Sequence, residues 1–123
     1  ILDHKGVICH QCNCVTKRGR GLSQQIFNKF PYANVYLSPI RIPGTIEIRE
    51  SGNQVIIALY AQHNPGRNTT NEPRLKWFEK CLNLVSQYYK DVAIPYAIVV
   101  GGNIADYHAI MSKSSLNIIL YKL

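Results

Sequence analysis

Apolar residues along the chain recur at two periods, one typical of strands and the other of helices. Alternating or continuous apolar runs predict strands over residues 6–13, 45–49, 54–61, 92–99 and 116–122. Helical spacing predicts three helices, over residues 22–30, 73–89 and 104–112. The turn residues 50–53 predict that the second and third strands form a hairpin. Because strands and helices then alternate, we expect an α/β fold with helices on both faces of a mixed, partly parallel sheet.

The length and composition indicate one packed domain with a basic surface. The 123 residues are 46% hydrophobic and 17% charged, which excludes disorder as the main description. Lys and Arg number 14 against 7 Asp and Glu, so we expect an anionic partner for this chain of formal charge +7. No apolar run approaches the roughly 18 residues of a membrane span, so no membrane association is expected. The chain starts at Ile1 without a Met, and we interpret residues 1–123 as a single domain whose start has been trimmed.

The four cysteines do not follow the pattern of a disulfide framework. Cys9, Cys12 and Cys14 fall within six residues, whereas small secreted domains spread their cysteines to join distant loops. We therefore expect a reduced, intracellular protein, cytoplasmic or nuclear. No second pair of ligands at zinc-binding spacing follows, so no metal site is expected and the thiols are interpreted as small buried groups.

Two glycine-containing loops each follow a predicted strand and precede a predicted helix. The first contains Gly19-x-Gly21 with Lys17, Arg18 and Arg20 beside it, and the second runs from Gly101 to Ala105. Glycine allows backbone amides to approach a ligand closely, and a helix start adds its positive dipole end. Two such loops facing each other would hold a diphosphate, although glycines at strand–helix junctions form ordinary turns in most proteins. Neither is a Walker loop or a complete G-x-G-x-x-G motif.

Several short motifs resemble those of macro domains, in the same order and spacing. Residues 8–14, where a predicted strand ends in Asn13-Cys14, and the following Gly19-Arg20-Gly21-Leu22-Ser23, which enters a helix, resemble the opening of a macro domain. Further matches are Phe30-Pro31, Pro43-Gly44-Thr45, Leu59-Tyr60-Ala61-Gln62, Ile94-Pro95-Tyr96 and the closing Ile119-Leu120-Tyr121-Lys122-Leu123. The resemblance implies a three-layer α/β/α fold that binds ADP-ribose and needs no cofactor.

The resemblance also implies which residues contact the ligand. Asn13 would meet the distal ribose, Gly19 and Gly21 would line that ribose and the phosphates, and Gln62 would form part of the wall. Residues 101–105 would surround the diphosphate with backbone amides. The complete expected set is Asn13, Gly19, Arg20, Gly21, Leu22, Gln62, Gly101, Gly102, Asn103, Ile104, Ala105 and Tyr107.

His10 and Asp106 are the candidate catalytic residues. His10 resembles the histidine of the yeast-type ADP-ribose 1″-phosphate phosphatases, in a similar His-x-Cys-Asn-Cys segment, and a neutral imidazole can accept a proton from water. Asp106 would position that water or protonate a leaving oxygen. The alternatives stay open: His10 as a strand histidine bonded to a carbonyl, and Asp106 as the acidic residue of a helix capped by Asn103. In the macro-domain branch that hydrolyses terminal ADP-ribose through a Lys/Asp pair, an Asp occupies the position of Asn103. An amide is neither a nucleophile nor a base, so Asn103 speaks against the Lys/Asp mechanism in this chain.

The sequence therefore favours an ADP-ribose-binding hydrolase. The expected substrates are ADP-ribose 1″-phosphate, O-acetyl-ADP-ribose or an ADP-ribosylated protein, each attacked by a water near the distal ribose. Two alternatives remain. One is a module that binds ADP-ribose or poly-ADP-ribose without chemistry, and the other is a basic domain that binds RNA through its charge, without specificity.

Overall fold

A mixed sheet forms the centre of the chain. In the computed structural model, which describes residues 1–96 and 103–122, this sheet has five strands in the order β2-β3-β1-β4-β5. Their bounds are β1 Val7–Gln11, β2 Ile46–Ser51, β3 Gln54–Leu59, β4 Asp91–Pro95 and β5 Asn117–Tyr121. The pairs β1–β3, β1–β4 and β4–β5 are parallel, and β2–β3 is antiparallel. The predicted mixed, partly parallel sheet and the hairpin are both confirmed.

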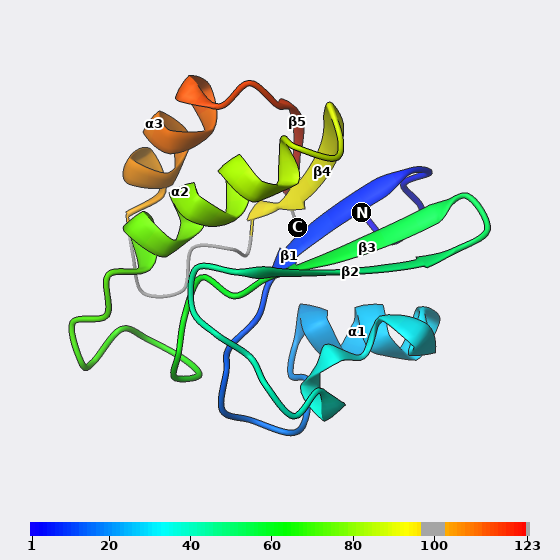
Figure 1. Ribbon diagram of the computed structural model, residues 1–123, viewed down its shortest axis with the longest axis horizontal. Coiled ribbons are helices and arrows are strands. Elements are labelled where there is room, and N and C mark those ends of the chain that lie inside the picture. The colour runs from blue at the N-terminus through cyan, green and yellow to red at the C-terminus, as the bar shows by residue number, and fades with distance from the viewer. Residues whose placement is uncertain (97–102, 123) are drawn as a thin grey trace.

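Helices cover both faces of this sheet, as the sequence predicts (Figure 1). Helix α1 (Leu22–Lys29) lies on one face together with the short 3-10 turns η1 (Pro31–Ala33) and η2 (Val35–Leu37). Helices α2 (Arg74–Val85) and α3 (Ile104–Lys113) lie on the other. The fold is therefore the three-layer α/β/α arrangement, and within the described residues no helix is long and apolar enough to cross a membrane.

The two cores follow from the alternation of side chains along the central strands. In β3, Val55 and Ile57 pack toward α2 and α3, while Ile56 and Ala58 pack toward α1. Such alternation directs successive side chains to opposite faces. Both faces of β3 are buried, which explains why its sequence is a continuous apolar run rather than an alternating one.

Several element ends differ from the sequence prediction; the strand expected over 54–61, for example, ends at Leu59. The helix expected over 73–89 ends at Val85, where Ser86 caps it, and the exposed Tyr88 belongs to the following turn. Tyr89 still packs against the core, so a core contact outside the helix extended the apparent stripe. The first strand ends at Gln11 rather than 13, although the backbone N–H of Cys12 still donates to the carbonyl oxygen of Leu59 at 2.8 Å. The strand predicted over 92–99 ends at Pro95, and its predicted residues 97–99 lie, like the glycine turn at 101–102, outside the described residues.

The topology brings three loops to one edge of the sheet. Strands β1, β3 and β4 run in the same direction, so their carboxyl ends meet at this edge. In open α/β sheets, loops at such an edge form the ligand sites. The chain continues there with Asn13 after β1, Gln62 after β3 and Tyr96 after β4.

Candidate functional site

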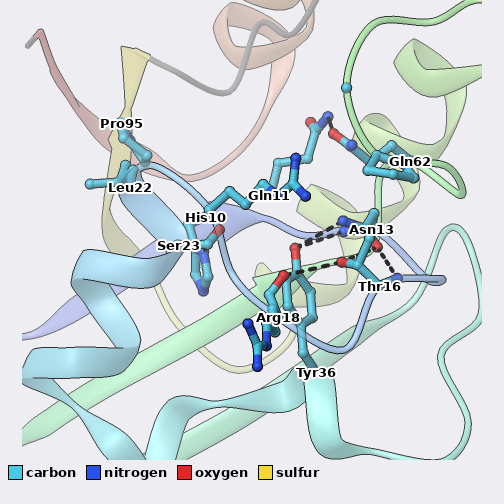
Figure 2. A pocket seen from close by; sticks show the side chains of 13 residues that line it. His10, Gln11, Asn13, Thr16, Arg18, Leu22, Ser23, Tyr36, Gln62 and Pro95 are labelled. Atoms are coloured by element: carbon cyan, nitrogen blue, oxygen red, sulfur yellow. Dashed lines mark hydrogen bonds between the residues drawn. The ribbon is translucent and has the colours of Figure 1, made fainter.

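A cavity of about 500 Å³ lies at this edge of the sheet (Figure 2). Its wall combines the end of β1, the loop after it, the start of α1, η2 and the loop after β3. The lining residues are His10, Gln11, Asn13, Thr16, Arg18, Arg20, Leu22, Ser23, Tyr36, Gln62, Pro65, Gly66 and Pro95. The cavity thus collects five of the expected site residues, His10, Asn13, Arg20, Leu22 and Gln62, together with Arg18 of the first glycine loop.

Asn13 organises the loop that follows β1. Its Oδ1 accepts hydrogen bonds from the backbone N–H groups of Val15 and Thr16 at 3.0 and 2.9 Å, and from Thr16 Oγ1 at 3.0 Å. Its Nδ2 donates to Tyr36 Oη at 3.3 Å (Figure 2). Asn13 lines the cavity as expected, but its side-chain oxygen is used within the protein, so only the amide nitrogen can serve a ligand.

His10 forms part of the cavity wall and is held neutral. The residue is only 2% exposed, and its ring packs edge-on against Phe27 with centroids 5.5 Å apart. Burial lowers the pKa of His10 to about 4, because removing the ring from water disfavours its charged form. Its nearest polar groups are Ser23 Oγ, 3.4 Å from Nδ1, and Cys12 Sγ, 3.6 Å from each ring nitrogen. A neutral imidazole beside a cavity can accept a proton from a bound hydroxyl or water.

The glycines of the first loop shape the backbone rather than the cavity surface. A Cβ on Gly19 would lie 2.9 Å from Phe27 Cδ2 and 3.0 Å from the backbone nitrogen of Gln24. Gly21 precedes α1 with φ of 55°, a left-handed value that favours glycine. Neither glycine is among the described residues that line the cavity. Their role is to bring the loop close to α1 and to turn the chain into it.

Cations dominate the charged part of the cavity wall. Arg18 and Arg20 line the cavity from exposed positions, and Lys17 precedes them on the same loop. Among the described lining residues there is no carboxylate. The wall therefore favours an anionic ligand and disfavours a cationic one.

A buried ion pair holds the opposite wall, formed by the loop after β3. Arg74 Nε lies 2.9 Å from Glu72 Oε2, and both side chains are less than a tenth exposed. Arg74 also donates to the carbonyl oxygens of Gly66 and Asn64, at 2.7 and 3.1 Å. Burial alone would raise the pKa of Glu72, but hydrogen bonds from Arg74 and from backbone amides outweigh it and hold that pKa below its usual value.

Two glutamines connect this loop to β1. Gln62 Nε2 donates to the carbonyl oxygen of Asn64 at 3.0 Å, so its Oε1 faces Gln11 Nε2 and accepts from it at 2.6 Å. Figure 2 shows the Gln11 side chain reaching toward Gln62 along the cavity. Gln62, expected as a wall residue, does line the cavity.

The residues expected from the second glycine loop are less completely placed. Gly101 and Gly102 lie outside the described residues. Asn103 caps α3, its Oδ1 accepting from the backbone nitrogen of Ala105 at 2.9 Å, and the exposed Asp106 follows in the first turn. Neither these residues nor Ile104 are among the described lining residues. Their ligand and catalytic roles therefore stay predictions.

Tyr107 occupies a different place from the one expected. Its side chain is 2% exposed and packs against Phe78, with ring centroids 5.0 Å apart, in the core under α2 and α3. Helical spacing in α3 turns this residue toward the sheet and away from the exposed Asp106. The structure thus corrects the expectation that this ring contacts the ligand, because it fills the core.

Sequence reasoning missed several wall residues, among them Ser23 and Tyr36. Ser23 lies in the first turn of α1, two residues after Gly21. Its position just after the Gly-x-Gly segment could have identified it as a wall residue. Tyr36 comes from η2, a short turn for which the apolar pattern gives no signal. Pro65, Gly66 and Pro95 are also lining residues that were not expected.

The four cysteines are free thiols. Burial raises the pKa of Cys14 to about 11 and that of Cys9 and Cys12 further, so the thiol form predominates at neutral pH. Within residues 1–96 and 103–122, no three His, Cys, Asp or Glu side chains gather in a way that could hold a metal ion.

Comparisons with known proteins identify the fold. No protein-family model and no curated protein matches this chain. Among solved structures, the chain is similar to an alphavirus P23pro-zbd, with a TM-score of 0.67 and 16% identity over 98% of this chain and 20% of that one. It is also similar to Thermosipho africanus DarTG in complex with ADP-ribose, with a TM-score of 0.67 and 15% identity over 97% of this chain and 38% of that one. The chain spans about a fifth and about two fifths of these structures, and the likeness shows that its fold is that of a macro domain.

Proposed function

We propose that this chain binds ADP-ribose in the cavity at the carboxyl edge of its sheet and hydrolyses an ADP-ribose derivative there. The observation that best supports this function is the position of Arg18 and Arg20 in the wall of a cavity of about 500 Å³. A diphosphate is the charged part of ADP-ribose, and a wall with arginines and no described carboxylate suits it. The DarTG structure of the same fold contains ADP-ribose, which also supports the proposal.

The proposed chemistry is hydrolysis, in which a water attacks the distal end of the bound molecule. His10 lines the cavity with a neutral ring, so it can take up a proton during attack. The candidate substrates are ADP-ribose 1″-phosphate, O-acetyl-ADP-ribose and ADP-ribosylated protein. Each leaves ADP-ribose as the product, so one binding site serves all three.

Calorimetric titration with ADP-ribose tests the binding step. We expect saturable binding with a stoichiometry of one, weakened by added salt because the arginines act on the diphosphate through charge. ADP and ribose 5-phosphate serve as fragments that should bind more weakly. The absence of binding heat at millimolar ADP-ribose would refute the proposal.

Turnover of the three substrates by wild type and by His10→Ala tests the hydrolytic step. We expect release of phosphate, acetate or unmodified protein by wild type and a fall of about 100-fold or more for the variant, since removing a general base costs that much. His108→Ala is the matched control, because His108 is exposed on α3 and is not a described lining residue. Equal rates for all three proteins would remove His10 from the mechanism.

A binding module without chemistry is the second candidate. It is favoured by the absence of a carboxylate among the described lining residues, since Asp and Glu are common catalytic acids and bases. Tight ADP-ribose binding with no turnover of any of the three substrates would select it.

A further inference from the structure

Ser23 and His10 bring a hydroxyl and a neutral imidazole together at the cavity wall. Ser23 is the second residue of α1 and His10 the fourth of β1, and Ser23 Oγ lies 3.4 Å from His10 Nδ1. Both side chains line the cavity and lie together in Figure 2. A nucleophile and its base are often this far apart before a substrate is bound and draw closer in the complex.

The hydrogen bonds of Tyr36 indicate the direction in which the protons point. Tyr36 Oη accepts from the backbone nitrogen of Asn13 at 3.2 Å and from its Nδ2 at 3.3 Å. These nitrogens can only donate, so they occupy both lone pairs of the Tyr36 oxygen, and the hydroxyl hydrogen of Tyr36 points to a neighbouring acceptor, Cys12 Sγ. Since the Tyr36 oxygen has no lone pair left for Ser23, the hydrogen of Ser23 Oγ is directed to His10 Nδ1. The lone pair of the neutral ring then faces Ser23.

The start of α1 adds a place for negative charge. No side chain caps this helix, whose N-cap residue is Gly21. The first N–H groups of a helix have no partner within it, and they attract negative charge at the positive end of the helix dipole. Arg18 and Arg20 line the same cavity. These groups make the cavity favour negative charge, such as that of an oxyanion, over the positive charge of an oxocarbenium ion.

We propose that Ser23 is a nucleophile activated by His10 and that the substrates of this site are acyl esters of ADP-ribose. The proposal rests on the proposed function, because the ester must be held through its ADP-ribose part. Addition to a carbonyl produces an oxyanion, which this wall favours. Cleavage of a glycosidic bond passes through an oxocarbenium ion, which it disfavours.

The reaction has two steps that need only water as co-reactant. Ser23 Oγ bonds to the acyl carbon while its proton passes to His10 Nδ1. The bond from that carbon to the ribose oxygen then breaks, and His10 returns the proton to the ribose oxygen. In the second step a water adds to the acyl-serine and gives its proton to His10. The bond to Ser23 Oγ breaks, Ser23 regains the proton, and a carboxylic acid leaves.

Three serine variants test the nucleophile with O-acetyl-ADP-ribose as substrate. We expect Ser23→Ala to lose about 100-fold or more in kcat while binding ADP-ribose within about two-fold of wild type. Ser23→Cys should accumulate an acetyl group on the introduced thiol, detected by intact-mass and peptide mass spectrometry after an acid quench. Ser112→Ala, at an exposed position on α3, is the control and should match wild type.

The outcomes separate this proposal from the proposed function. If ADP-ribose binds and Ser23→Ala deacetylates at the wild-type rate, or no acetyl group is found on Ser23→Cys, the nucleophile is refuted and the binding function stands. Preferential turnover of ADP-ribose 1″-phosphate over the acetyl ester refutes the acyl substrate class. If wild type binds no ADP-ribose, both proposals are refuted.

Discussion

The burial of His10 predicts that acid destabilises this protein well above the pH range in which carboxylates titrate. The pKa of His10 is about 4 in the folded chain, against 6.5 for an unburied histidine. Between these values the unfolded chain binds a proton that the folded chain excludes, so the free energy of unfolding falls as the pH falls. At 1.36 kcal/mol per pKa unit, the full effect is about 3 kcal/mol, and about 2 kcal/mol of it is lost between about pH 7.5 and pH 5. The free energy of unfolding of a domain of this size is about 5–15 kcal/mol in total, so the loss is readily measurable.

Urea unfolding of wild type and His10→Gln, followed by Trp77 fluorescence at several pH values, measures this effect. Glutamine does not titrate, so we expect the stability of the variant to change less over the same range. The difference between the two proteins should approach about 2 kcal/mol at about pH 5, even if the variant is less stable throughout. The pKa values of Glu47 and Glu72 are lowered from their usual value, so the contributions of these carboxylates to the free energy of unfolding are lost only at lower pH. Parallel pH profiles for the two proteins, or an imidazole NMR titration of His10 with a midpoint near 6.5, would refute the reasoning.

Three further predictions concern the walls of the cavity. Glu72→Gln should lower the free energy of unfolding by about 2–3 kcal/mol in urea titrations, because it leaves Arg74 buried without its carboxylate, and an unchanged midpoint would contradict this. Gly19→Ala should cost about 1–3 kcal/mol by the same measurement, since its Cβ would meet the Phe27 ring and nearby backbone, and a neutral result would show that the loop can move aside. Arg20→Ala should weaken ADP-ribose binding about five-fold at low salt and less at high salt. A loss that is independent of salt would argue against a charge effect.

The layers of the fold could be predicted from the sequence because they depend on local periodicity. The apolar run in β3 and the stripe through Phe78 and Leu82 each require burial on a particular face, and the structure provides it. The turn before Gln54 fixes the hairpin register through short-range geometry. Such signals lie within one element and its neighbours in the chain.

The cavity could be predicted only in part, because its walls join residues that are distant in the sequence. The loop containing Asn13 was identifiable, but its bond to Tyr36 depends on how η2 packs. The pair of Glu72 and Arg74 looks like two ordinary surface charges in the sequence, and only the folded loop buries them. Tyr107 illustrates the opposite error, since its motif position suggested a ligand contact while its place on α3 directs it into the core.

The central place of β1 in the sheet has a consequence for how the chain is made. This strand is synthesised first, yet it pairs with β3 through Val7 and Val55 and with β4 through Ile8 and Ala93. Until the ribosome has delivered both partners, at least one edge of β1 is open and its apolar side chains are incompletely covered. Pairings between distant segments form slowly, and uncovered strand edges promote aggregation. We expect nascent chains that stop before β4 to need chaperones, and His10 to gain its buried environment only after that strand emerges.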